Sequence, residues 1–98
     1  MDRDRVIAML RAHETELRSA GVVRISVFGS TVRGDRRPDS DIDLLAAFDE
    51  GKQLSLLDVV HIENQIGELL GGRVDLVEEG TLKPRVRTSV EAEAVRAF

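Results

Sequence analysis

Two aspartates, Asp41 and Asp43, stand two residues apart at the start of the mostly apolar segment 42–48, IDLLAAF. In an extended strand, such side chains leave the same face, and their Cα atoms lie roughly 6.5 Å apart. Two ionised carboxylates at this spacing repel each other, and a divalent cation relieves the repulsion. Magnesium suits one or two carboxylates because water and substrate phosphates complete its octahedron. The pair predicts metal-assisted phosphate chemistry, with two solvated loop-end aspartates as the alternative.

A third carboxylate, Asp75, lies in the predicted strand 73–79, RVDLVEE. Val74 and Leu76 flank it, so its side chain faces away from that apolar pair. If strand 73–79 lies beside strand 42–48, the three carboxylates converge. Taken alone, Asp75 equally fits a solvated strand residue.

Gly29 and Ser30 follow the predicted strand 23–28, VRISVF, and precede a short helical turn. A turn from strand to helix presents backbone N–H groups to a phosphate. Glycine lets the ligand approach the backbone closely, and the serine hydroxyl adds a donor. The two residues are a candidate phosphate cradle, with an ordinary turn as the alternative.

A calcium-binding EF-hand is a competing interpretation of the acidic cluster. Asp39, Asp41, Asp43 and Glu50 match loop positions 1, 3, 5 and 12 of that motif. The sixth position requires glycine for a sharp turn, and here it is Leu44. The apolar residues after Asp43 would also lie in a solvated loop, so the sequence argues against a calcium hand.

The elements that must position these residues follow from hydrophobic periodicity and from helix-ending signals. Asp2 and Ser55 are predicted N-caps, and Gly21 and Gly71 are predicted to end helices. The expected order is helix 3–19, strand 23–28, loop 33–39, strand 42–48, helix 56–70, strand 73–79 and helix 84–97. This order predicts an α/β (α+β) fold with a small mixed β-sheet flanked by helices, and residues 1–98 as a single domain.

Composition limits the classes of function. The chain has 98 residues, 42% of them hydrophobic, no cysteine and a net charge of −4. A negative charge and only 3% aromatic residues make direct nucleic-acid binding unexpected. No apolar run reaches the roughly 20 residues of a membrane span, and the first residues lack the features of a signal peptide. We therefore expect a cytoplasmic protein with no membrane partner.

The two motifs together resemble a known signature. Gly29-Ser30, ten residues and then Asp41-x-Asp43 is similar to the G-S-x10-D-x-D pattern of the DNA polymerase beta nucleotidyltransferase superfamily. The string GSTVRGDRRPDSDIDLL resembles its smallest branch, the minimal nucleotidyltransferase (MNT) antitoxins. The resemblance extends to VDLV around Asp75 and to the tail LKPRVRTSVEAEAV. It implies the polymerase beta-like nucleotidyltransferase core.

The resemblance also implies roles for individual residues. Asp41 and Asp43 would hold two Mg²⁺ ions, and Asp75 would complete the second metal site and activate the acceptor hydroxyl. Gly29 and Ser30 would bind the β- and γ-phosphates of ATP. A further candidate nucleotide ligand is Arg33, because a guanidinium suits bidentate phosphate contact; a solvated loop arginine is the alternative.

The family further implies an acceptor and a partner. MNT antitoxins transfer AMP from ATP to a tyrosine of a toxin of the "higher eukaryotes and prokaryotes nucleotide-binding" (HEPN) class. About 50 residues follow the motif here, and one helix, one strand and one further helix use them, so we expect the acceptor on a partner protein. Two alternatives stay open: an antitoxin that inhibits by contact alone, and a nucleotidyltransferase that modifies a small molecule or RNA with another subunit.

Overall fold

The computed structural model describes residues 2–34, 37 and 39–98, so the predicted loop 33–39 lies partly outside the described residues. Its elements are α1 (Arg3–Ala12), α2 (Glu14–Ala20), β1 (Val22–Phe28), α3 (Ser30–Arg33), β2 (Ile42–Phe48), η1 (Glu50–Lys52), α4 (Leu56–Leu70), β3 (Val74–Glu78), η2 (Glu79–Thr81), α5 (Pro84–Glu93) and β4 (Val95–Arg96). The strands form one sheet in the order β3-β2-β1-β4. β2 is parallel to β3, whereas β1 is antiparallel to both its neighbours. This confirms the predicted mixed α/β fold; the single-domain assignment of residues 1–98 stays a prediction.

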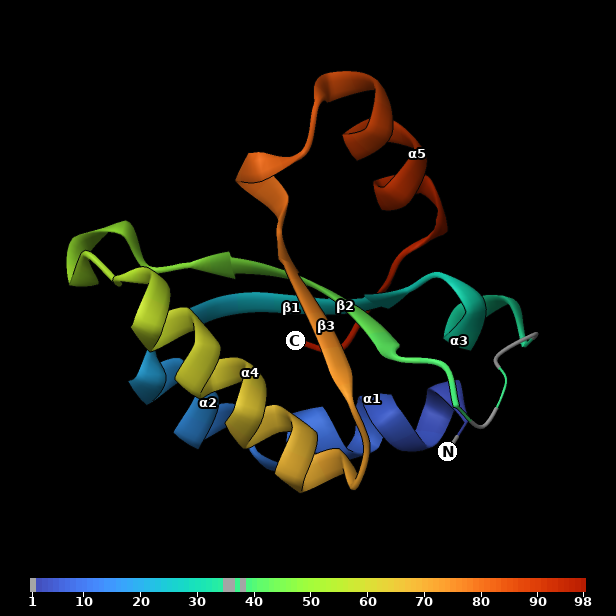
Figure 1. The fold of residues 1–98 in the computed structure, drawn as a ribbon, viewed down its shortest axis with the longest axis horizontal. Helices are drawn as coiled ribbons and strands as arrows, with labels where there is room; N and C mark the ends of the chain where they lie inside the picture. The colour runs from blue at the N-terminus through green and yellow to red at the C-terminus, as the bar shows by residue number, and fades with distance from the viewer. Residues whose placement is uncertain (1, 35–36, 38) are drawn as a thin grey trace.

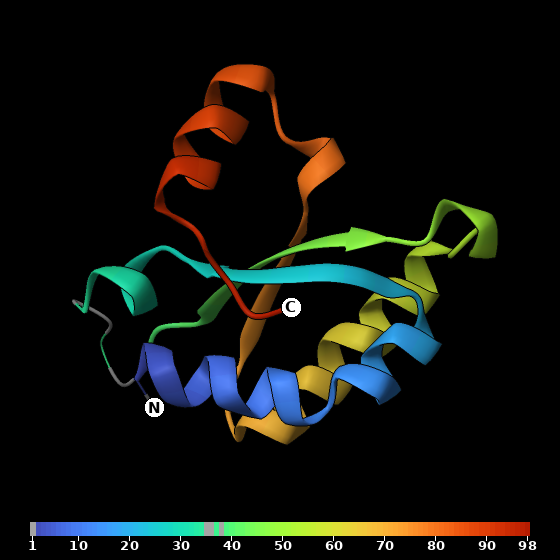
Figure 2. The same cartoon turned by 180° about the vertical axis from the view of Figure 1, so that it is seen from behind.

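The helices divide between the two faces of the sheet. Figures 1 and 2 show α1, α2 and α4 on one face and α5 on the other side. The core lies between the sheet and helices α1, α2 and α4. It includes Val6, Leu10, Leu17, Ile25, Val27, Ile42, Leu44, Ala46, Ile62, Ile66, Leu70 and Leu76. The alternation of a strand explains this division. Alternate residues of β2 point into that core, and Val22, Ile25 and Val27 of β1 do so on either side of a register shift between Val22 and Arg24.

Strand β2 carries both core residues and the candidate site residue Asp43. Ile42, Leu44 and Ala46 are buried beneath the helices, whereas Asp43 is half-buried and lies between them in sequence. Alternation therefore directs Asp43 to the face that α5 overlooks. The predicted strand 42–48 matches β2 residue for residue.

The N-terminal helical region differs from the prediction. A single helix over 3–19 is wrong, because α1 ends at Ala12 and α2 begins at Glu14. His13 has non-helical backbone angles, and its Nδ1 lies 2.9 Å from the carbonyl oxygen of Met9. A side chain that engages the carbonyl of the preceding turn competes with the helical hydrogen bond there. The predicted Asp2 cap is confirmed by its bond from the Arg5 N–H.

Helix α4 connects the two parallel strands β2 and β3, and it fixes where β3 starts. Ser55 and Asp58 form a reciprocal capping box at its first turn. Gly71 ends the helix in the left-handed region, where glycine is favoured. The predicted bounds 56–70 are confirmed.

The C-terminal segment also differs from the prediction. Helix 84–97 is wrong, because α5 ends at Glu93 and β4 then pairs with Ser26 and Val27 of β1. The chain leaves the helix because its last residues complete the sheet edge and bury Phe98. Within the described residues, none of the helices is both long and apolar enough to cross a membrane.

Candidate active site

The two central carboxylates come from neighbouring strands. Asp43 of β2 lies opposite Asp75 of β3 in the parallel register. Registered residues of adjacent strands point to the same face, so both side chains leave the sheet on the side of α5. Strands β2 and β3 are therefore adjacent, as the convergence of Asp43 and Asp75 requires. The roles of the two residues stay predictions.

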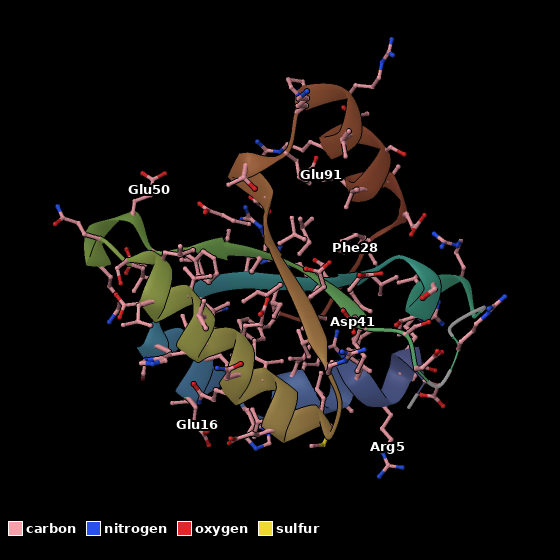
Figure 3. All side chains as sticks on the ribbon, viewed as in Figure 1. Arg5, Glu16, Phe28, Asp41, Glu50 and Glu91 are labelled. Carbon is pink, nitrogen blue, oxygen red and sulfur yellow. The ribbon has the colours of Figure 1, made fainter. Side chains whose placement is uncertain are left out.

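Asp41 lies just before β2 and is held toward the start of β3. Its Oδ1 is 3.3 Å from Nε of Arg73, whose side chain is 83% exposed. Such an exposed ion pair contributes little free energy and is readily exchanged for another cation. The backbone supports the same corner, because the Ile42 N–H donates to the carbonyl of Arg73 at 2.9 Å. Figure 3 shows Asp41 at this end of the sheet, far from Glu50.

That separation excludes the calcium hand. The segment between Asp43 and Glu50 is strand β2, which is extended and largely buried. An EF-hand loop would instead fold Glu50 back onto the first aspartates.

Gly29 makes room for Asp43. A Cβ atom at position 29 would lie 2.3 Å from Oδ2 of Asp43, so the carboxylate or the backbone would have to shift. The backbone at Gly29 has φ 73° and ψ −149°, a conformation occupied almost only by glycine. Gly29, which lies in the turn from β1 into α3, is therefore in direct contact with Asp43 of β2.

An acidic side chain from α5 meets the same turn. The Gly29 N–H donates to Oε1 of Glu93 at 2.6 Å. Arg33 Nη1 donates to the same oxygen at 3.0 Å, so the predicted phosphate ligand pairs with a carboxylate. Ser30 is the first residue of α3 and is half-buried beside this contact. Glu93 could not be found from the sequence, because 64 residues separate it from Gly29 and no motif marks it.

The electrostatics of the site are strongly negative. Burial, followed by the charges of Asp75 and Asp41, raises the pKa of Asp43 above its ordinary value. Arg33 acts in the opposite direction, and Glu93 adds a further negative charge. Such crowding of carboxylates is the conflict that a divalent cation resolves.

The acidic side chains of the site are ligands of the kind that magnesium takes. In the part of the chain that the structure describes, no three acidic or histidine side chains are grouped as a metal centre. Asp43 and Asp75 nevertheless offer hard oxygen ligands on one face, and Asp41 pairs with an exposed arginine. The residues present therefore fit Mg²⁺, which takes one or two carboxylates and fills its remaining positions with water and phosphate.

Comparison with known proteins identifies the family. A family described as Nucleotidyltransferase domain matches residues 10–97. The chain belongs to this nucleotidyltransferase family. It is 43% identical over 93 residues to protein adenylyltransferase MntA of Thermococcus cleftensis, covering 94% of this chain and 92% of that protein.

Solved structures agree with this assignment. One described as a minimal nucleotidyltransferase has a TM-score of 0.81 and 44% identity, over 97% of this chain and 95% of the other. A second contains a tri-AMPylated HEPN toxin of Shewanella oneidensis with its MNT antitoxin, at a TM-score of 0.65, 17% identity and coverage of 94% and 71%. The first confirms the resemblance to minimal nucleotidyltransferases, and the second shows a shared fold.

Proposed function

We propose that this nucleotidyltransferase is an antitoxin that transfers AMP from ATP to a hydroxyl group of a HEPN-type toxin. The proposed acceptor is a tyrosine hydroxyl. The observation that carries the proposal is the pairing of Asp43 with Asp75 beside Gly29. The 43% identical adenylyltransferase supports the reaction, and the AMPylated toxin bound to an MNT antitoxin supports the kind of partner. A cytoplasmic location and the absence of direct nucleic-acid binding stay predictions.

In the proposed reaction, an acceptor hydroxyl oxygen attacks the α-phosphorus of ATP. A new P–O bond forms, the bond to the β-phosphate oxygen breaks, and pyrophosphate leaves. Asp75 accepts the hydroxyl proton on a carboxylate oxygen, because it lies exposed on the face from which an acceptor approaches. Gly29, Ser30 and Arg33 hold the β- and γ-phosphates in place.

Asp41, Asp43 and Asp75 would hold two Mg²⁺ ions. When bound, these ions neutralise the phosphates and stabilise the entering and leaving oxygens of an in-line displacement. The chain's own contribution is rigidity, because Asp43 and Asp75 stand on paired strands rather than on a loop. The ions also account for how a protein of net charge −4 holds a polyanion.

The test is intact-mass measurement of the partner toxin after incubation with this protein, ATP and Mg²⁺. We expect the toxin to gain one or more AMP units with the wild type. The double substitution Asp41→Asn with Asp43→Asn should abolish the gain while the circular dichroism spectrum stays unchanged. A mass gain of equal size with the double variant would refute the assigned roles. Neutralisation of the toxin by wild type without any mass gain would favour inhibition by contact.

A further inference from the structure

We propose that Glu93 occupies the place of a nucleotide phosphate in the nucleotide-free protein, and that the polyphosphate of the incoming nucleotide displaces it. This inference rests on the proposed function and adds a competing residue to the same site. Its basis is that one carboxylate oxygen accepts from both Gly29 and Arg33, two of the groups expected to bind phosphate.

The contact has the character of a bound anion. The Gly29 nitrogen lies 2.6 Å from Oε1 of Glu93, and hydrogen bonds to an ionised acceptor are shorter than those between neutral groups. A backbone N–H carries a single proton, so a phosphate oxygen and this carboxylate compete for it. The guanidinium of Arg33 likewise faces Oε1 of Glu93 at 3.0 Å.

Electrostatics favour displacement once phosphates arrive. Glu93 is one of the charges that raise the pKa of Asp43, so it adds to the negative field of the site. A triphosphate that enters with Glu93 still in place would meet a further like charge close by. Moving this side chain away removes the repulsion and transfers the Gly29 and Arg33 donors to the phosphate.

Helix α5 is built so that Glu93 can move. Glu93 is the last residue of α5, and Ala94 leaves the helix with extended backbone angles. No residue of α5 is buried, so few apolar contacts hold the helix in one position. The helix is tied instead to η2 by the ion pair of Arg87 with Glu79, and Glu79 also pairs with Arg24 of β1. The pairing of β4 with β1 holds Val95 and Arg96, which follow the end of α5, and does not hold the helix itself.

Calorimetric titration with AMP-PNP and Mg²⁺ tests the proposal, with Glu93→Gln compared with wild type. We expect Glu93→Gln to bind AMP-PNP at least about fivefold more tightly, because one like charge near the phosphates is gone. Inorganic pyrophosphate should show the same gain, whereas adenosine, which has no phosphate, should show none. Glu91→Gln is the matched control: it removes the same charge from the same helix, where Glu91 pairs with Arg87, and it should bind like wild type.

A second measurement does not depend on affinity. The amide resonance of Gly29 should differ between wild type and Glu93→Gln in the nucleotide-free proteins. Saturation with AMP-PNP should bring the two resonances together, because phosphate then accepts from this N–H in both. A difference that persists undiminished would show that Glu93 stays in place and would overturn displacement.

The remaining outcomes separate this inference from the proposed function. If wild type binds AMP-PNP and modifies the toxin, yet Glu93→Gln binds no more tightly, only the displacement is wrong. If neither protein binds AMP-PNP or pyrophosphate, the displacement and the proposed function are both wrong.

Discussion

The two faces of the sheet are filled in opposite ways. On one face, α1, α2 and α4 bury a continuous apolar core, and Ile66 of α4 is completely buried. On the other face, α5 contributes no buried residue, and its Val86 is 46% exposed. The carboxylates Asp43 and Asp75 leave the sheet on this second side. In β2 the core residues Ile42, Leu44 and Ala46 thus alternate with the candidate site residue Asp43, so we expect a change in either set to have little effect on the other.

The largest effect is expected in the helix-covered core. Ile66→Ala should lower the free energy of unfolding by about 2–5 kcal/mol, because a fully buried side chain leaves a cavity. Ile66→Val removes less volume and should cost about 0.5–1.5 kcal/mol. Chemical denaturation measures both. A loss for Ile66→Ala below that of Ile66→Val would contradict the packing described for this face.

The next effect falls on the site. Gly29→Ala should lower AMP transfer by about 100-fold, because the added Cβ displaces the Asp43 carboxylate and misplacement by an ångström has costs of this size. Gly34→Ala is the control for loss of a glycine at a positive φ, since Gly34 has φ 80° and a Cβ there meets no atom of the described residues within 4 Å. It should cost about 1 kcal/mol of stability and leave transfer within about twofold. Equal loss of transfer in both variants would mean that backbone strain, not contact with Asp43, is responsible.

The sequence predicted those parts of the fold whose signals are local. Strand β2 follows from its apolar run, and α4 follows from the Ser55 cap, its apolar spacing and Gly71. The carboxylate pair and the glycine turn could likewise be read from spacing, since each lies within one short segment. The approach of Asp75 to Asp43 could be predicted only on the condition that their strands are neighbours, because the pairing of β2 with β3 depends on the whole fold.

The parts that could not be predicted depend on contacts between distant segments. The break at His13 needs a ring to reach the carbonyl of Met9, and helical periodicity continues through it. Strand β4 is two residues long and exists only because β1 offers it an edge. The contact of Glu93 with Gly29 also depends on distant segments, because α5 is placed by tertiary structure and not by a pattern in its own residues.

A smaller effect is expected at the start of α4, the helix that connects the core to β3. Ser55→Ala should cost about 1 kcal/mol, because the Asp58 N–H loses the serine oxygen as its acceptor at 3.2 Å. Ser55→Asn should restore most of this loss, since asparagine is also a favourable N-cap. Thermal unfolding of the three proteins measures the difference. A cost for Ser55→Asn as large as that for Ser55→Ala would show that the cap is not what stabilises this end of α4.

The smallest effect is expected on α5. Val86→Ala should change the free energy of unfolding by no more than about 0.5 kcal/mol, because Val86 is 46% exposed and surface substitutions fall in this range. Amide hydrogen exchange extends the comparison to the whole helix: α5 should exchange through local opening, whereas α4 should be protected up to global unfolding, since α4 contributes buried residues to the core and α5 contributes none. Protection of α5 equal to that of α4, or a cost for Val86→Ala that approaches the cost of Ile66→Ala, would mean that α5 is packed as firmly as the opposite face. Glu93 would then be held in place by its helix, and nucleotide could displace it only by unfolding that structure.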